Sequence, residues 1–439
     1  MSRTPLEEPA EPRVRLLRAD RRQVLLRPTD IEQLLPPDHR ARGVWDFVQG
    51  LDLGAFYDEV ESVEGRAGRP AIDPAILLSL WLYATVEGIG SARAVARLCD
   101  EHHAYQWICG GVSVEYRTLS DFRVKHAEKL DELLTASVGA MVHAGIVKLK
   151  LVAQDGMRVR AAAGAASFRR RSTLNGCLKD ARAQVRALKR ELEEDPGALS
   201  RQEAAARLRA AEDRAKRVKT ALAHAERLSG KKDDDVDGPP SGRSHEGRQE
   251  AKEPRVSTTD PEARVMRFAD GGYRPAYNAQ LATDVGSQII VGVDVSNSGT
   301  DYGQLAPMLE QVARRYGTTP HAALVDGGFA GLKDIDDAST VHDCDVYAPP
   351  MNRRNGKPLA MALKGDTKAV RRWRRRMDTK RGKEVYKKRG ATSECVNAQA
   401  RNRGLLRLTV RGIAKVRAVL LLYALGHNLL RAMNLRPAT

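Results

Sequence analysis

The sequence predicts a mixed α/β protein, with an all-helical N-terminal region in front of a domain built on a mixed sheet. Three observations support this. Apolar residues recur at helical spacing through residues 30–145, short apolar runs that end in Gly, Pro or Asp begin at residue 146, and later runs alternate with helical patterns. Strands that are first adjacent and then separated by helices form a mixed sheet.

The N-terminal region carries clear helix signals. Asp73 and Pro74 make a favourable helix start, because Asp caps the first turn and Pro occupies a position where no donor is needed. Residues 88–91 end that helix and begin another, and a further helix is predicted over about 119–144. Residues 30–145 are therefore predicted to form a helical, DNA-binding domain with a helix-turn-helix-like unit, although an ordinary helical bundle has the same spacing.

The sheet domain is assigned to residues 146–172 and 257–432. Its first strand is predicted over residues 147–153, ending at Gln154-Asp155-Gly156. The later elements are strands at 277–283, 288–295, 322–325 and 344–347, with a helix over 302–316.

An insertion separates the first strand from the others. Between Leu174 and Ala225 apolar residues recur at spacings of four and three, as in a coiled-coil seam, and the pattern is interrupted near Pro196. Ser200 and Glu203 then match a capping box. Residues 173–228 are thus predicted to form a helical hairpin. The charged, Gly- and Pro-rich segments 229–256 and 1–29 are predicted to be a disordered linker and tail.

Composition narrows the class of protein. Lys and Arg outnumber Asp and Glu by 73 to 56, giving a net charge of +17 and a pI near 9.8, which suggests a polyanionic partner. Five scattered cysteines fit a reducing compartment better than a disulfide framework. There is no run of eighteen apolar residues and no apolar core near the N-terminus, so we expect a cytoplasmic protein without a membrane anchor or secretory signal.

Two predicted strands end in Asp-Gly, at Asp155 and Asp326. Loops at that end of strands commonly build sites. Two adjacent carboxylates repel each other unless a divalent cation lies between them, and two Mg²⁺ ions about 3.5–4 Å apart stabilise an in-line attack at phosphorus. Spacing does not identify a third carboxylate, and Asp-Gly after a strand is also a common turn. Asp284 and Asp294 are expected to serve the predicted hairpin.

Several motifs resemble those of DDE transposases from bacterial insertion sequences, over nearly the whole chain. They are Asp155-Gly156, Tyr277-Asn278-Ala279-Gln280, Asp326-Gly327-Gly328-Phe329 and the run from Glu394 to Arg401. Gly68-Arg69-Pro70 and the helices after it resemble the N-terminal domain of the same proteins. The resemblance implies a ribonuclease-H-like catalytic core.

The same resemblance implies residue roles. The family's Tyr, Arg, Glu and basic-residue motif is matched by Tyr386, Arg389, Glu394 and Arg401. One extra residue separates Arg389 from Glu394, and Arg401 replaces the usual Lys. The implied metal ligands and catalytic acids are Asp155, Asp326 and Glu394, holding two Mg²⁺ ions for which Mn²⁺ can substitute. Tyr386, Arg389 and Arg401 would contact phosphates near the scissile bond.

The implied reaction is metal-dependent hydrolysis at the ends of the element, followed by strand transfer. Its partner would be double-stranded DNA, namely the terminal inverted repeats and the target DNA. A homodimer of this protein would hold that DNA in a synaptic complex. We expect no small-molecule substrate and a location at the bacterial nucleoid.

A dense basic run precedes Glu394, over residues 368–389. Such a run often forms only a solvated face, but its position favours contact with the DNA backbone. The DNA-binding residues predicted here, besides Tyr386 and Arg389, are Arg371, Arg372, Trp373, Arg374, Arg375, Lys387 and Lys388.

Three alternatives remain at this stage: a nuclease of the same fold without strand transfer, a catalytically inactive DNA-binding relic or regulator, and a basic RNA- or ribosome-associated protein. A zinc site at Cys99, His102, His103 and Cys109 is disfavoured, because the spacing lacks a paired-ligand pattern and the segment has helical periodicity.

Overall fold

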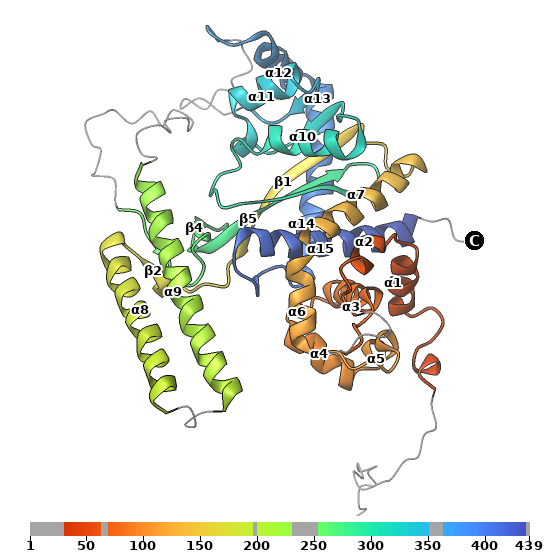
Figure 1. Ribbon diagram of the computed structural model, residues 1–439. Coiled ribbons are helices and arrows are strands. Elements are labelled where there is room, and N and C mark those ends of the chain that lie inside the picture. The colour runs from red at the N-terminus through yellow and green to blue at the C-terminus, as the bar shows by residue number, and fades with distance from the viewer. Residues whose placement is uncertain (1–29, 63–68, 196–199, 231–252, 351–362, 436–439) are drawn as a thin grey trace, which may run out of the picture.

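A computed structural model describes residues 30–62, 69–195, 200–230, 253–350 and 363–435 of the chain (Figure 1). The predicted tail 1–29 and residues 231–252 of the predicted linker 229–256 lie outside these described residues; at the ends of that linker, residues 229 and 230 belong to a helix and residue 256 to a strand.

The N-terminal region is helical, as predicted. Its central helix is α3 (Pro74–Val86), which begins with Pro74 and is capped by Asp73, whose carboxylate accepts the N–H of Ala75 at 2.8 Å. Almost every side chain of α3 is buried because other helices surround it. The other helices of the region are η1 (Glu32–Leu34), α1 (Arg40–Gln49), α2 (Gly54–Tyr57), α4 (Ala92–Glu101), α5 (His103–Cys109), α6 (Tyr116–Lys125) and α7 (Ala127–His143). Of these, α1, α4, α5 and α6 contact α3.

The second region is built on a mixed sheet, so the predicted α/β class is confirmed. Its strands run in the order β4-β5-β1-β7-β8, and β6 also pairs with β5. β1 is antiparallel to β5 but parallel to β7. The strands are β1 (Leu151–Arg160), β4 (Arg264–Arg267), β5 (Tyr273–Asp284), β6 (Ile290–Ser296), β7 (Ala322–Leu324) and β8 (Asp345–Tyr347).

The prediction that the first strand ends at Asp155-Gly156 is wrong. β1 continues to Arg160, because β5 supplies ladder partners along its whole length: Asp155 pairs with Leu281 and Gly156 with Gln280. Asp155 therefore lies inside a strand rather than in a turn.

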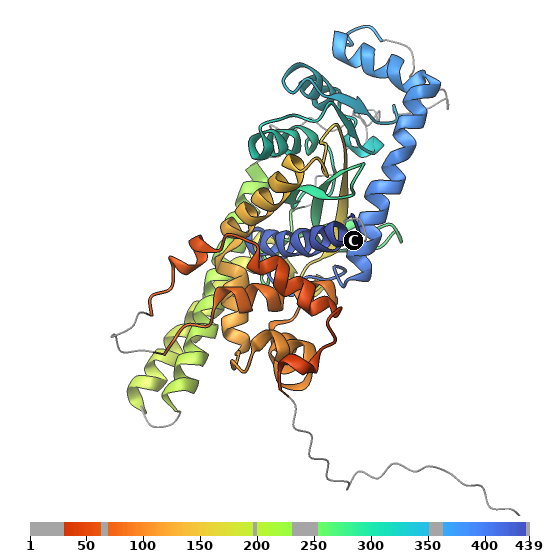
Figure 2. The same cartoon turned by 90° about the vertical axis from the view of Figure 1, so that its right-hand side faces the viewer.

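Helices cover both faces of the sheet. α10 (Leu305–Tyr316) and α7 contact β6. The long segment of α13 (Lys380–Arg389), η4 (Gly390–Glu394) and α14 (Cys395–Asn402) lies on the other side of the sheet from α10 in Figure 2, where η4 contacts β1 and β5. α11 (Leu332–Thr340) and α12 (Lys368–Asp378) pack around β8.

A helical hairpin projects from the sheet region (Figure 1, lower left). It consists of α8 (Arg171–Glu194) and α9 (Arg201–Gly230), which lie side by side within the segment predicted to be inserted. Its buried seam is formed by small and apolar residues such as Leu174, Ala181 and Val218. At its base η2 (Ala165–Ser167) leads into β2 (Phe168–Arg169), which pairs with β3 (Val256–Ser257).

The last helix, α15 (Ile413–Leu435), joins the two regions. By length and composition it is apolar enough to cross a membrane, but 67% of its apolar window is buried inside the protein. It packs against α3 and α7 of the helical region and against β6 of the sheet. The apolar composition of α15 is that of a core helix, because most of its apolar side chains pack in the interior of the protein.

Candidate active site

Asp155 lies in β1, and Asp326 comes shortly after the end of β7, the parallel neighbour of β1. Ala153 of β1 is opposite Leu324 of β7, so the same register two residues further on places Asp155 beside Asp326. Asp326 follows β7 and caps η3 (Gly327–Phe329), where its Oδ1 accepts the N–H of Gly328 at 2.7 Å. The two carboxylates are thus brought together by strand pairing.

Arg389 connects Asp155 to Glu394. Its Nη1 is 3.6 Å from Asp155 Oδ2, and its Nη2 is 3.1 Å from Glu394 Oε1. The turn between Arg389 and Glu394 is π-helical rather than α-helical. A π-helical turn accommodates one additional residue within a helix, which accounts for the extra residue between Arg389 and Glu394 relative to the usual family spacing.

Both oxygens of the Asp155 carboxylate accept hydrogen bonds. Oδ1 accepts the N–H of Gly156 at 3.0 Å, and Oδ2 accepts Nδ2 of the buried Asn397 at 2.9 Å. Burial raises the pKa of Asp155 to about 6; Arg389 opposes this rise, and the charges of Asp326 and Asp301 add to it. The surroundings of Asp155 therefore offset its negative charge only in part, and a bound cation would stabilise the charged form.

The donor set suits a divalent cation in its chemistry. Carboxylate oxygens are the ligands that Mg²⁺ and Mn²⁺ prefer, and the mutual repulsion of Asp155 and Asp326 favours a cation beside them. Within the described ranges no three His, Cys, Asp or Glu side chains are grouped closely enough to hold an ion. Glu394, the third predicted acid, has a side chain that is 66% exposed, and its carboxylate contacts Arg389.

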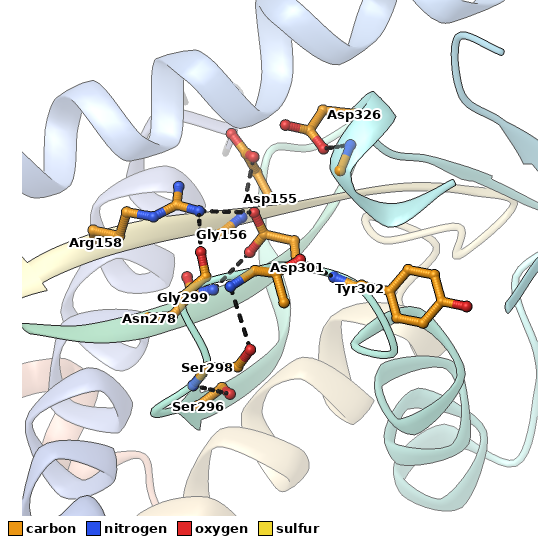
Figure 3. Close-up of polar contacts among 12 residues, drawn as sticks. Asp155, Gly156, Arg158, Asn278, Ser296, Ser298, Gly299, Asp301, Tyr302 and Asp326 are labelled. Atoms are coloured by element: carbon orange, nitrogen blue, oxygen red, sulfur yellow. Dashed lines mark hydrogen bonds and ion pairs between the residues drawn. The ribbon is translucent and has the colours of Figure 1, made fainter. Parts of the chain in front are cut away.

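Asp301 and Asn397 are site residues that the sequence reasoning missed. Asp301 precedes α10 and is 5% exposed; it accepts hydrogen bonds from Asn278 Nδ2 at 2.6 Å and Gln280 Nε2 at 2.7 Å (Figure 3). A signal was present in β5, because Asn278 and Gln280 lie two residues apart on one face of the strand, and buried amide side chains need polar partners.

The predicted DNA-binding residues differ in how far their side chains are exposed. Tyr386 is half-buried, and its ring lies 5.9 Å from the Arg389 guanidinium. The exposed members are Arg371, Arg372, Arg375, Lys387, Lys388 and Arg401.

Trp373 and Arg374 are buried, so the prediction that they bind DNA is corrected. The indole N–H of Trp373 donates to the carbonyl of Ala348 at 3.1 Å, and Arg374 Nε is 2.8 Å from Asp366 Oδ2. The physical reason is that α12 is amphipathic: the face that carries Trp373 packs toward β8 and α11.

Other residues weighed from the sequence have structural roles. Cys99 and Cys109 are buried in the helical core, as expected. Asp284 accepts the N–H groups of Leu149 and Ser287 and so stabilises the turn between β5 and β6.

Comparisons with known proteins agree with this geometry. A transposase domain family matches residues 29–125, which covers most of the helical region, and a transposase DDE domain family matches residues 245–429, which includes Asp326 and Glu394. Asp155 lies outside both matches. The comparisons with curated proteins and with solved structures returned no match. The chain belongs to the DDE transposases.

Proposed function

We propose that this protein is the transposase of a bacterial insertion sequence, which binds the terminal inverted repeats of its own element, cleaves the DNA there and joins the ends to target DNA. The observation that supports this best is the neighbouring pair of acids Asp155 and Asp326, which Arg389 links to Glu394. Strand pairing aligns the first two, and Arg389 contacts both Asp155 and Glu394.

We also propose a ribonuclease-H-like core for residues 146–172 and 257–432. Its support is the strand arrangement, in which antiparallel β4, β6, β5 and β1 are followed by parallel β7 and β8. Residues 30–145 would then be the DNA-binding domain and residues 173–228 an inserted hairpin.

DDE transposase domains are generally dependent on divalent metals. In this chain Asp155, Asp326 and Glu394 would hold two Mg²⁺ ions, or Mn²⁺ in their place. When bound, these ions lower the pKa of the attacking water or 3′-hydroxyl and stabilise charge on the leaving oxygen.

The protein's own groups prepare this site. Gly156 N–H and Asn397 orient Asp155, and Gly328 N–H orients Asp326. Arg389 reduces the repulsion between Asp155 and Glu394 and carries further donors suited to a phosphate. The exposed Arg and Lys side chains of α12–α14 would bind the DNA backbone, so binding should weaken as salt rises.

Transposition needs two DNA ends held together, so we propose a homodimer in the synaptic complex, acting on DNA in the bacterial cytoplasm. The net charge of +17 supports a DNA partner of this kind.

Cleavage of a supercoiled plasmid that carries the element's own ends tests the proposal. Wild type, Asp326→Ala and the control Asp337→Ala, which alters a half-buried acid of α11, are compared with Mg²⁺ and with EDTA. We expect Mg²⁺-dependent cuts and joined products at the element boundaries, lost only in Asp326→Ala while DNA binding persists.

Two results would count against the proposal. DNA binding without cutting, under either Mg²⁺ or Mn²⁺, would indicate an inactive DNA-binding protein. Cutting without any joined product would indicate a nuclease.

A further inference from the structure

The carboxylate of Asp301 lies against the backbone of both Asp-Gly sequences. A Cβ atom on Gly156 would come within 2.0 Å of Asp301 Oδ1, and a Cβ atom on Gly328 would lie 3.7 Å from Asp301 Oδ2. Gly156 directly follows Asp155, and Gly328 lies two residues after Asp326. Asp301 is therefore next to both acids of the proposed metal site, although it comes from the loop before α10 (Figure 3).

Neutral donors hold one oxygen of Asp301. Asn278 and Gln280 both donate to Oδ1, whereas the nearest cation, Arg158, is 3.6 Å from Oδ2. Arg158 Nη2 also donates to the carbonyl of Gly299 at 3.0 Å, so its guanidinium is shared. Burying a carboxylate is costly unless it is hydrogen-bonded, and here amide dipoles satisfy it without cancelling its charge.

The charge of Asp301 reaches the proposed site. It is among the charges that raise the pKa of Asp155, together with that of Asp326. Arg158, on the same strand as Asp155 and with a side chain 30% exposed, forms an ion pair with Asp301 that partly offsets the charge of Asp301. Groups that surround metal ligands commonly set how tightly the ion is held.

We propose that Asp301 is a positioning residue that strengthens divalent-cation binding at Asp155 and Asp326, with Arg158 as its partial counter-charge. The inference rests on the proposed function. Asp301 adds a negative charge beside the two acids from the strand face that carries Gly156, and the missing side chain of Gly156 makes that approach possible.

Calorimetric titration of the full-length protein with Mn²⁺, in the absence of DNA, tests this. Asp301→Asn retains an oxygen that accepts from Asn278 and Gln280 but removes the charge. We expect the Asp155-dependent Mn²⁺ affinity to fall by about 10–100-fold. Arg158→Gln, on a partly exposed side chain, should have the opposite effect and tighten binding. Asp284→Asn, which neutralises a buried carboxylate at the β5–β6 turn, should leave the Mn²⁺ affinity unchanged.

A purely structural role of Asp301 would not produce opposite changes in Mn²⁺ affinity in Asp301→Asn and Arg158→Gln. Wild-type affinity in a folded Asp301→Asn would overturn the inference, as would weaker binding by Arg158→Gln. If Asp301→Asn does not fold, as judged by circular dichroism, Arg158→Gln decides alone.

Asp155→Asn separates failure of the inference from failure of the proposed function. If it abolishes Mn²⁺ binding while Asp301→Asn keeps the wild-type affinity, only the role of Asp301 is wrong. If wild type itself binds no Mn²⁺, the proposed metal site and the role of Asp301 are both overturned.

Discussion

Replacing Gly156 by alanine should strongly destabilise the sheet region. The added Cβ would lie 2.0 Å from Asp301 Oδ1, 2.6 Å from Gln280 Nε2 and 2.8 Å from Asn278 Oδ1. None of these contacts is sterically allowed. The three polar groups are themselves joined by hydrogen bonds, so no single side chain can move without breaking one.

The interactions that Gly156→Ala disrupts set the size of the expected loss of stability. Displacing Asp301 breaks two hydrogen bonds to a charged group, each worth about 1.5–3 kcal/mol. Overpacking a well-filled interior adds strain of about 1–3 kcal/mol where the backbone cannot shift. We therefore expect Gly156→Ala to lower the free energy of unfolding by about 4–9 kcal/mol.

Urea unfolding followed by circular dichroism measures this, with Gly164→Ala as the matched control. Gly164 has an ordinary φ of −89° and nothing within 4 Å of an added Cβ. Its substitution should change the free energy of unfolding by less than about 0.5 kcal/mol. Equal stability of the two variants would refute the close packing of Asp301 on Gly156.

Three further predictions concern other parts of the molecule. Arg374→Met should lower the free energy of unfolding by about 3–5 kcal/mol, because it leaves a buried carboxylate without its ion-pair partner. The exposed Arg375→Met should leave stability unchanged and weaken DNA binding in mobility-shift assays. Burial lowers the pKa of His427 to about 4, whereas an unfolded His titrates near 6.5. The unfolded chain therefore takes up the proton first, and stability should fall by about 3 kcal/mol as the pH drops from 6.5 to 4; His427→Gln should flatten this part of the pH–stability curve. Asn397→Ala, which removes a donor to Asp155, should slow DNA cleavage by about 10–100-fold with DNA binding retained.

Each of these has a contradicting result. Arg374→Met as stable as Arg375→Met would show that the ion pair is not buried. An unchanged pH profile in His427→Gln would assign the acid sensitivity to other groups. Cleavage by Asn397→Ala at the wild-type rate would remove Asn397 from the orientation of Asp155.

Local patterns were sufficient to predict much of the fold. The start of α3 at Pro74 follows from the capping Asp73, and the two inserted helices follow from their apolar spacing. The end of β1 was mispredicted because Asp155-Gly156 has the local chemistry of a turn. Whether a strand stops there depends on β5, which lies more than one hundred residues away and continues the ladder.

The burial of Trp373 and Arg374 was predictable in principle. Val370, Trp373 and Met377 recur at spacings of three and four, which marks an apolar face inside a helix that is otherwise strongly basic. The number of charges in that run concealed the pattern.

The sequence indicates that Asn278 and Gln280 need a buried polar partner, but it does not identify Asp301 as that partner. Asp301 lies in a polar loop without a motif, and its proximity to Asp155 arises only when β1 and β5 pair and α10 packs on the sheet. The geometry of Arg389 likewise depends on the π-helical turn; the sequence shows the extra residue between Arg389 and Glu394 but not the turn that accommodates it.

The most direct test of the proposed active site is the substitution Glu394→Gln, because Glu394 is an exposed side chain whose removal should not disturb the fold. Cleavage and strand transfer of labelled element ends are measured beside Glu384→Gln, which changes an exposed acid one helix earlier. We expect Glu394→Gln to bind the ends, to remain folded and to neither cleave nor join them, whereas Glu384→Gln retains both reactions. Cleavage by Glu394→Gln at the wild-type rate would contradict the assignment of Asp155, Asp326 and Glu394 as the catalytic acids.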